Sequence, residues 1–451
     1  MRDPSAPAVP FDCDGTRMRI VMKRTWMVAA ALLLRAGAAA AQEPVNFMHA
    51  LGLSARASAR GDTAGALAAL EAAERRWPGQ PMVLRELARV HARAGRRDEA
   101  VAALGRLWSS GVAAPLEDDP ALAPLRRLPA FRRVSARLAA AAAPLVRADT
   151  AFVLDDADLV PESVAYDPAS RSFFAGSMGR RKVVRVGPSG AVSDFVPAGP
   201  EGPGEVLGIR VDPARGALWV NHWMADDAAP AGFAGRRGWA AMDRYDLRTG
   251  RRTWRAVLRD TARAHLLNDL AVDAAGEVFA TDSEGGAVYR LRPGADTLER
   301  FFGGPPDFVY PNGIALAPDG RTLFVAHLEG ISAFGRDGRR RLLAAPPEVA
   351  TGFGDGLYPC GDRLVMIQGL DGHHRVAAFR LDAARERVTG AVLLEQRHPA
   401  HDVPTTGVLV DGALVYVANS QVRRVNVDGT LSPDGRARPV LLRLPLECGD
   451  Q

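Results

Sequence analysis

The sequence predicts a mainly β protein, a six-bladed β-propeller preceded by a small α-helical repeat domain. Two observations lead to this prediction. A strand-turn-strand pattern recurs six times after residue 150, and each copy is followed by two more strand-like runs. The residues before it show helical periodicity with almost no strand signal. Six units of four strands, at a spacing of roughly 40–60 residues, are typical of a propeller rather than a sandwich.

The N-terminus carries the layout of a secretory signal peptide. Lys23 and Arg24 precede an apolar run, Trp26–Leu34, and a small-residue stretch, Ala36–Ala41. We assign residues 1–41 to a start-site extension and a signal peptide, and expect a periplasmic or secreted protein. A buried N-terminal helix is the alternative. The apolar run is too short to span a bilayer, so we expect no stable membrane insertion.

Residues 45–147 are rich in Ala, Leu and Arg with helical periodicity. Gly61 and Gly95 lie 34 residues apart. The alanines and the leucine that follow Gly61 match those that follow Gly95, so that Leu70 corresponds to Leu104. A 34-residue helix-turn-helix period resembles tetratricopeptide repeats. This part of the chain is therefore expected to dock a protein partner or to pack against the next domain, with a helical hairpin cap as the alternative.

Residues 151–446 form the predicted propeller. The clearest copy is Tyr310–His327, in which the turn Pro318-Asp319-Gly320 separates two apolar runs. The run Ala151–Asp156 is expected to close the ring with the last blade. The six copies are Pro161–Met178, Leu207–Trp223, Asn268–Ser283, Pro311–His327, Gly354–Gly369 and Thr405–Ser420.

Charge and cysteine content narrow the function classes. The net charge is +5, but the arginines are scattered along the chain, so we expect no nucleic-acid partner. Cys360 and Cys448 are the cysteines of the mature chain, and they show no metal-ligand spacing. An exported protein could pair them, and the sequence leaves that pairing open.

One position near the start of each predicted first strand is polar in five of the six copies. In a propeller the innermost strands run in the same direction, so these residues meet at one end of the central channel. Two carboxylates, two carboxamides and a hydroxyl are then expected together. The six residues are Glu162, Leu207, Asn268, Asn312, Asp355 and Thr406, and we call them the axial column.

A shared cation is the simplest partner for the four acidic and amide side chains, because unpaired buried charge is costly. Oxygen donors without sulfur or imidazole favour Ca²⁺, with Mg²⁺ or Mn²⁺ as alternatives. The other explanation is that these side chains cap strand ends and bond to one another or to water. The predicted metal ligands are Glu162, Asn268, Asn312 and Asp355.

The segments PES, ND, PNG and DGL, which contain the four predicted metal ligands, resemble the gluconolactonase/regucalcin family, also called senescence marker proteins. The resemblance runs from Asp156 to about Leu446. The chain also resembles the paraoxonases, in LLND, in NGI and in VNH at Val220–His222. The resemblance implies a six-bladed propeller with an axial Ca²⁺ at which lactones or esters are hydrolysed. By position, Asp355 matches a proposed general base as well as a ligand, Asn268 matches a ligand or substrate contact, and His222 matches a paraoxonase active-site histidine.

Three departures from these families limit what the resemblance implies. Leu266 stands where gluconolactonase-like enzymes for sugar acids place an arginine, which argues against a carboxylated sugar lactone. Ser163 stands where paraoxonases have an acidic residue near a second Ca²⁺, and Gly356 stands where they have an additional amide ligand. A single cation and a rather hydrophobic substrate are therefore expected.

The sequence thus predicts an exported Ca²⁺-dependent hydrolase of lactones or esters, with Asp355 and His222 as catalytic residues. His327 ends the second strand of the fourth blade, and His373 lies in the loop between the second and third strands of the fifth, so both are expected at the site's end of the channel. The alternative is a non-catalytic, metal-stabilised propeller that binds a protein or peptide through its repeats. The candidate substrate contacts are Asn268, Leu266, Thr406, His327 and His373.

Overall fold

The structure is a computed structural model, and it describes residues 44–112, 116, 118–224, 239–258, 264–304, 308–370, 373–426 and 429–448. The predicted signal peptide lies outside these residues. Five α-helices and a 3₁₀ helix come first. They are α2 (Phe47–Ala59), α3 (Thr63–Arg76), α4 (Pro81–Arg93), α5 (Arg97–Ser109), η1 (Pro120–Leu125) and α6 (Pro129–Ala141). None of the helices among the described residues combines the length and the apolar character that crossing a bilayer requires.

The 34-residue repeat corresponds to two helix pairs, α2–α3 and α4–α5. Gly61 and Gly95 lie in the turns inside these pairs, with φ of 75° and 74°, a conformation that glycine adopts without a steric penalty. Leu70 and Leu104, which occupy the same repeat position, are fully buried. The predicted periodicity therefore reflects two equivalent helical hairpins.

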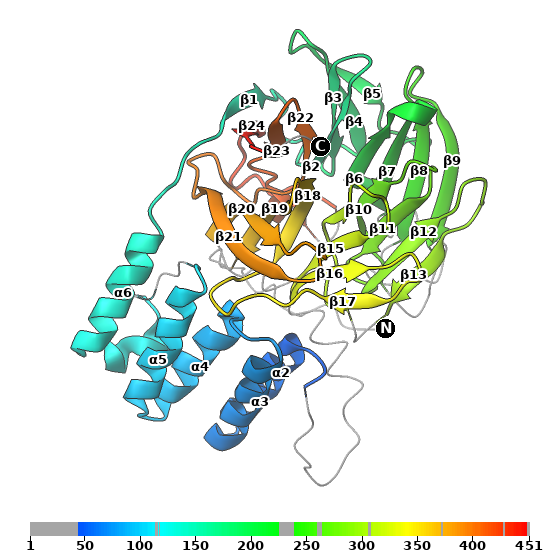
Figure 1. Ribbon diagram of the computed structural model, residues 1–451. Coiled ribbons are helices and arrows are strands. Elements are labelled where there is room, and N and C mark those ends of the chain that lie inside the picture. Colours follow the sequence, from blue (N-terminus) through cyan, green and yellow to red (C-terminus); the bar gives the residue numbers. More distant parts are fainter. Residues whose placement is uncertain are drawn as a thin grey trace, which may run out of the picture. The chain divides into compact units, whose positions relative to one another are not determined.

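Six four-stranded antiparallel sheets follow, so the predicted fold class is confirmed. Figure 1 shows the sheets as separate groups of arrows, with the helices in blue and cyan. The first strands of neighbouring sheets contact one another in sequence, and the first strand of the last sheet contacts that of the first sheet, so the ring is closed.

The blades are named in chain order. Blade 1 is β2 (Pro161–Asp167), β3 (Ser172–Ser177), β4 (Lys182–Val186) and β5 (Val192–Val196). Blade 2 is β6 (Glu205–Asp212), β7 (Ala217–Met224), β8 (Trp239–Asp246) and β9 (Arg252–Leu258). Blade 3 is β10 (Leu267–Val272), β11 (Val278–Asp282), β12 (Ala287–Leu291) and β13 (Glu299–Gly303).

Blade 4 is β14 (Ile314–Leu316), β15 (Leu323–His327), β16 (Gly330–Phe334) and β17 (Arg340–Leu342). Blade 5 is β18 (Gly354–Cys360), β19 (Arg363–Leu370), β20 (His373–Leu381) and β21 (Val388–Gln396). Blade 6 is β22 (Gly407–Val410), β23 (Ala413–Val417), β24 (Val440–Pro445) and the N-terminal strand β1 (Asp149–Val153).

Blade 6 is completed by a strand from the other end of the propeller sequence. β1 pairs antiparallel with β24, as the apolar run that begins at Ala151 predicts, although the strand itself spans Asp149–Val153. The ring is thus closed by hydrogen bonds between the two ends of the chain, which leaves no unpaired edge between the first and last blades.

Each repeat copy forms the inner hairpin of its blade, and the aspartates that end the first strands have a local role. The carboxylate of Asp167 accepts from the backbone N–H of Ala169, and that of Asp273 accepts from the N–H of Glu277. These bonds stabilise the turn and fix the hairpin register, and with it the position of the column residue at the other end of the strand.

Apolar side chains fill the space between adjacent blades. One cluster joins Phe324 of β15 to Met366 of β19 and Phe379 of β20, and all three are almost completely buried. Because each core lies between two sheets, the blades stabilise one another and not only themselves.

A disulfide joins blade 5 to the end of the propeller. Cys360 at the end of β18 bonds to Cys448, which follows β24, with their Cα atoms 4.5 Å apart. The bond closes an 88-residue separation. The pairing that the sequence left open is therefore present in the structure.

Replacing both cysteines, in Cys360→Ser/Cys448→Ser, should lower the free energy of unfolding by about 2–4 kcal/mol, because the unfolded chain gains freedom. Denaturant titration without reductant measures this change. Reductant should lower the stability of the wild type and leave the double variant unchanged. Equal midpoints for the two proteins without reductant would contradict the prediction.

Candidate functional site

The axial column lies at one end of the ring. Glu162, Asn268 and Asp355 lie near the starts of β2, β10 and β18. Thr406 directly precedes β22, and Asn312 lies two residues before β14. Glu162, Asn268 and Asn312 are at most 7% exposed, and Asp355 is half-buried with its Oδ1 covered. The four predicted ligands therefore come from blades 1, 3, 4 and 5.

Electrostatics and hydrogen bonding connect these side chains. Burial, followed by the charge of Asp355, raises the pKa of Glu162 well above its ordinary value. Burial and the charge of Asp269 raise the pKa of Asp355 to about 7, and a hydrogen bond from the amide of Asn312 opposes this shift. Because the pKa values of Glu162 and Asp355 are both raised, negative charge in this site is unfavourable unless a cation is present.

The amide side chains turn their nitrogens toward protein acceptors. Nδ2 of Asn268 donates to Oγ of Ser283 at 3.1 Å, and the amide of Asn312 donates to Asp355. The Oδ1 atoms of Asn268, Asn312 and Asp355 are buried without a hydrogen-bond partner. Among the described residues no protein group pairs with these oxygens, so the arrangement fits a bound cation with oxygen ligands.

Two neighbouring hydroxyl groups hold Glu162. Oγ of Ser420 donates to its Oε2 at 2.9 Å, and Oγ1 of Thr405 donates to its backbone carbonyl at 2.7 Å. Thr406, predicted to contact substrate, also donates to this carbonyl, at 3.1 Å. Its hydroxyl thus joins blade 6 to blade 1.

The charge next to the column is balanced by the protein. Asp269 is buried, and NH2 of Arg210 lies 3.7 Å from its Oδ1. Ser163, where an acidic residue would support a second ion, donates its hydroxyl to the carbonyl of Leu207. A guanidinium therefore faces Asp269, in keeping with a single cation.

The three predicted histidines lie in hydrogen-bond networks within their own blades. His222 is fully buried, Nδ1 accepts from the N–H of Gly204 at 2.9 Å, and Nε2 lies 3.1 Å from Oδ2 of Asp243. Burial lowers the pKa of His222. Both ring nitrogens are engaged, so the structure does not bring His222 into the column as a free base.

His327 and His373 have similar surroundings. Nε2 of His327 lies 2.9 Å from Oγ of Ser332, and Nδ1 accepts from the N–H of Glu329. Nε2 of His373 lies 3.1 Å from Oε1 of Gln396, and burial lowers the pKa of His373 to about 4. These bonds stabilise blades 4 and 5, and within the described ranges none of them reaches a column residue.

Leu266 directly precedes β10 at the site's end of the ring, as predicted, and its N–H donates to Oδ1 of Asp282 at 2.9 Å. Asp282 also lies 2.6 Å from Nδ1 of His265. The apolar side chain of Leu266 is half-buried beside Asn268 in sequence, where the resembling enzymes carry a guanidinium.

Tyr310, the first residue of the clearest repeat copy, lies near the column carboxylates. Burial raises its pKa, and so do the charges of Glu284, Asp355 and Glu162. Burial and the charge of Asp282 raise the pKa of Glu284 to about 7. A phenol that stays protonated therefore lies close to the column carboxylates. Its position directly before the PNG segment was the available signal.

The column does not depend on a conventional cluster of charged ligands. In the described part of the chain, no group of three or more His, Cys, Asp or Glu side chains is arranged to hold a metal ion. A cation in the column would use two carboxylates and two amide carbonyls, a donor set that suits a hard ion such as Ca²⁺.

The comparison with family models agrees with the helical-repeat fold. The tetratricopeptide repeat family model matches residues 57–115, which confirms the repeat prediction for the helices. No curated protein matches the sequence.

Among solved structures, a gluconolactonase from Xanthomonas campestris is 24% identical, with a TM-score of 0.45, over 68% of this chain and 93% of that one. Regucalcin from Agrobacterium tumefaciens, described as a calcium-binding protein, is 14% identical, with a TM-score of 0.43, over 67% and 96%. Virginiamycin B lyase from Staphylococcus aureus is 12% identical, with a TM-score of 0.42, over 65% and 98%. Such similarity does not assign an activity to this chain.

Asn312→Ala should raise the Kd for Ca²⁺ by at least about 10-fold, because it removes one ligand oxygen and the hydrogen bond to Asp355. Isothermal titration calorimetry after removal of bound metal measures the change. Asn426→Ala, which removes an amide from the β23–β24 connection, is the control and should leave the Kd unchanged. An unchanged Kd in Asn312→Ala would remove Asn312 from the ligand set.

The raised pKa of Asp355, about 7, predicts a pH dependence of stability without metal. The neutral form is favoured in the folded protein, so its contribution is complete below the pKa of the unfolded carboxyl, near 4, and is lost as pH rises through 7. In chelator, the melting temperature of the wild type minus that of Asp355→Asn should therefore fall between pH 5 and pH 8. The histidines contribute to both proteins and cancel in this difference.

Ca²⁺ at pH 8 should restore the wild type and have little effect on Asp355→Asn. A difference in melting temperature that is constant with pH would show that Asp355 has an ordinary pKa.

Proposed function

We propose that the protein is an exported, Ca²⁺-dependent hydrolase of lactones or esters. The observation that carries the proposal is the set of three buried, unpartnered Oδ1 atoms, from Asn268, Asn312 and Asp355, at the end of the ring where Glu162 also lies. The resemblance of the PES, ND, PNG and DGL segments to gluconolactonases supports hydrolysis as the reaction.

The donor set favours Ca²⁺ as the cation. Carboxylate and amide oxygens are hard ligands, and Ca²⁺ accepts them in irregular geometry, whereas Mg²⁺ requires near-octahedral coordination. Mg²⁺ and Mn²⁺ are the alternatives. When bound, the cation supplies Lewis acidity toward a carbonyl oxygen.

The chain's own residues supply the other requirements of hydrolysis. Asp355 accepts the proton of the attacking water, a role that its match to the proposed general base of the resembling enzymes supports. The protonated phenol of Tyr310 offers a hydrogen-bond donor to an oxygen of the substrate. Leu266 contributes an apolar surface beside Asn268, so a lactone or ester with an alkyl or aryl group fits better than a sugar acid.

Export is supported by two features that are far apart in the sequence. Lys23 and Arg24 precede the apolar run typical of a signal peptide, and Cys360 bonds to Cys448. Disulfides persist in oxidising compartments such as the periplasm and the extracellular space.

A second candidate function is binding of a protein partner by the helical repeats, with the propeller stabilised by the metal. The match of residues 57–115 to tetratricopeptide repeats favours it, because such repeats are common binding scaffolds. Trp108 on α5 is 38% exposed, and the guanidinium of Arg137 lies 5.0 Å from its ring centroid. These residues offer an aromatic and cationic surface to a peptide.

A panel of aryl esters and alkyl-substituted γ- and δ-lactones, assayed in Ca²⁺ and in chelator, tests the proposal. We expect turnover that chelator abolishes and Ca²⁺ restores. Asp355→Ala should lower kcat/KM by at least about 100-fold, since it removes both a ligand and the general base. Asp362→Ala is the matched control: that carboxylate is 68% exposed at the opposite end of β18 and should not affect the rate.

The two candidate functions predict different results. If Ca²⁺ raises the melting temperature but no ester or lactone is hydrolysed, the hydrolase proposal is wrong and the binding role is favoured.

A further inference from the structure

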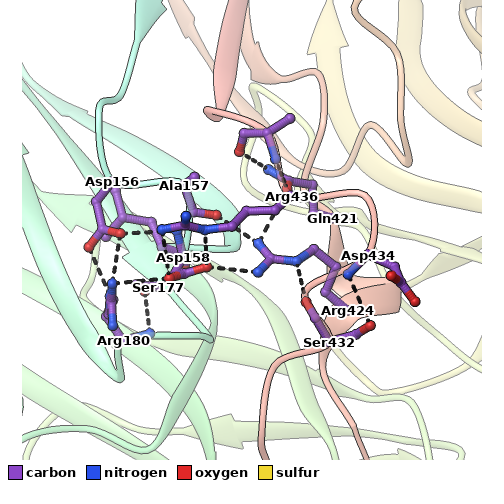
Figure 2. Close-up of polar contacts among 12 residues, drawn as sticks. Asp156, Ala157, Asp158, Ser177, Arg180, Gln421, Arg424, Ser432, Asp434 and Arg436 are labelled. Carbon is purple, nitrogen blue, oxygen red and sulfur yellow. Dashed lines mark hydrogen bonds and ion pairs between the residues drawn. The ribbon is translucent and has the colours of Figure 1, made fainter.

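An ion-pair cluster with one buried arginine at its centre joins the first and last blades. Two aspartates of the segment before β2 meet three arginines, and Figure 2 shows the contacts. NH2 of Arg424 lies 2.7 Å from Oδ1 of Asp158, and Nε of Arg436 lies 3.0 Å from the same oxygen. We call this the seam cluster. Its members are Asp156, Asp158, Arg180, Arg424 and Arg436.

The centre of the seam cluster is Arg424, which is only 4% exposed although it is charged. Besides Asp158, its Nε donates to the carbonyl of Ser432 at 2.8 Å and NH1 donates to the carbonyl of Ala157 at 2.8 Å. A buried guanidinium with three such partners holds both the segment before β2 and the β23–β24 connection in one arrangement.

The seam cluster is linked to Glu162 through the backbone. Asp158 lies four residues before it, and the segment between them includes Val160, whose φ is 46°. A β-branched residue is strained in this left-handed region, so neighbouring contacts must maintain the conformation. The bonds from Arg424 to Ala157 and Asp158 are such contacts, and they lie directly before the strained residue in the sequence.

The seam cluster is also linked to the carboxylate of Glu162, through Ser420. Ser420, whose hydroxyl donates to Oε2 of Glu162 at 2.9 Å, is followed by Gln421 in a left-handed conformation with φ of 61°. Oε1 of Gln421 accepts from the N–H of Ala437 at 2.9 Å and lies 3.4 Å from NH1 of Arg424. The cluster thus fixes the turn that presents Ser420.

We propose that the Asp158–Arg424 pair positions Glu162 as a metal ligand from both sides, through the backbone of residues 158–162 and through the hydroxyl of Ser420. This inference rests on the proposed metal site. Glu162 and Asp355 repel each other when ionised, so an unsupported Glu162 would turn away from the column and a cation would have to reorder it. If the carboxylate is held in place before the cation arrives, the free energy of binding does not include the cost of reordering it.

Calorimetric titration with Ca²⁺ of the full mature chain and its variants tests the proposal. Asp158→Asn and Ser420→Ala should each raise the Kd by about 10-fold, as loss of support behind a ligand does. The double variant should be weaker than wild type by clearly less than the product of the two effects, because both changes act on Glu162. Arg438→Ala is the control, since its pair with Asp155 lies at the same seam but is 63% and 94% exposed.

Each outcome supports or overturns the proposal. A lower melting temperature in Asp158→Asn with the wild-type Kd would show that the cluster only stabilises the fold. Ser420→Ala removes one hydroxyl and should fold normally. Its Kd therefore tests the link through Ser420 separately from the link through the backbone. If the wild type bound no Ca²⁺, the proposed function would fail together with this inference, whereas equal affinities in wild type and variants would overturn this inference alone.

Discussion

The proposed site depends on one constraint: carboxylate and amide oxygens are buried at one end of the ring, with no cationic partner among the residues that the structure describes. Several other buried acids lie beside a cationic or titratable side chain. Asp243 faces Arg255 and His222, Asp269 faces Arg210, and Asp282 faces His265. Among the described residues Glu162 and Asp355 have no such partner, and the charge of Asp355 raises the pKa of Glu162. A cation removes that cost, so the column is better explained as a binding site than as a structural cap.

Ring closure determines whether such a site can exist. The four proposed ligands come from four blades, so their separation depends on every inner strand keeping its register. β1 completes blade 6, Thr405 and Thr406 bond to the carbonyl of Glu162, and the seam cluster joins the same two blades. The same contacts that close the propeller also hold Glu162 in place. Stability at the seam and order at the site are therefore coupled.

The sequence was sufficient for the fold and the column because both repeat. A hairpin and a polar position that recur in each blade can be aligned within one chain, which gave Asn312 and its equivalents. The histidines show the limit of this reasoning. His222 resembles an active-site residue by its neighbours in sequence, but its partner Asp243 lies on the next strand and outside the repeat pattern. Arg210 and Ser420 gained their roles only from three-dimensional contacts.

The central claim is that one cation binds the four column side chains. A crystal structure of the protein grown with Ca²⁺, with anomalous difference density collected at a long wavelength, tests it most directly. If one cation binds these side chains, the density should show one strong peak within about 2.3–2.6 Å of an oxygen from each of Glu162, Asn268, Asn312 and Asp355. Density for water alone in the column, with Oδ1 of Asn268 and Asn312 hydrogen-bonded to it and calcium absent or elsewhere, would contradict the account.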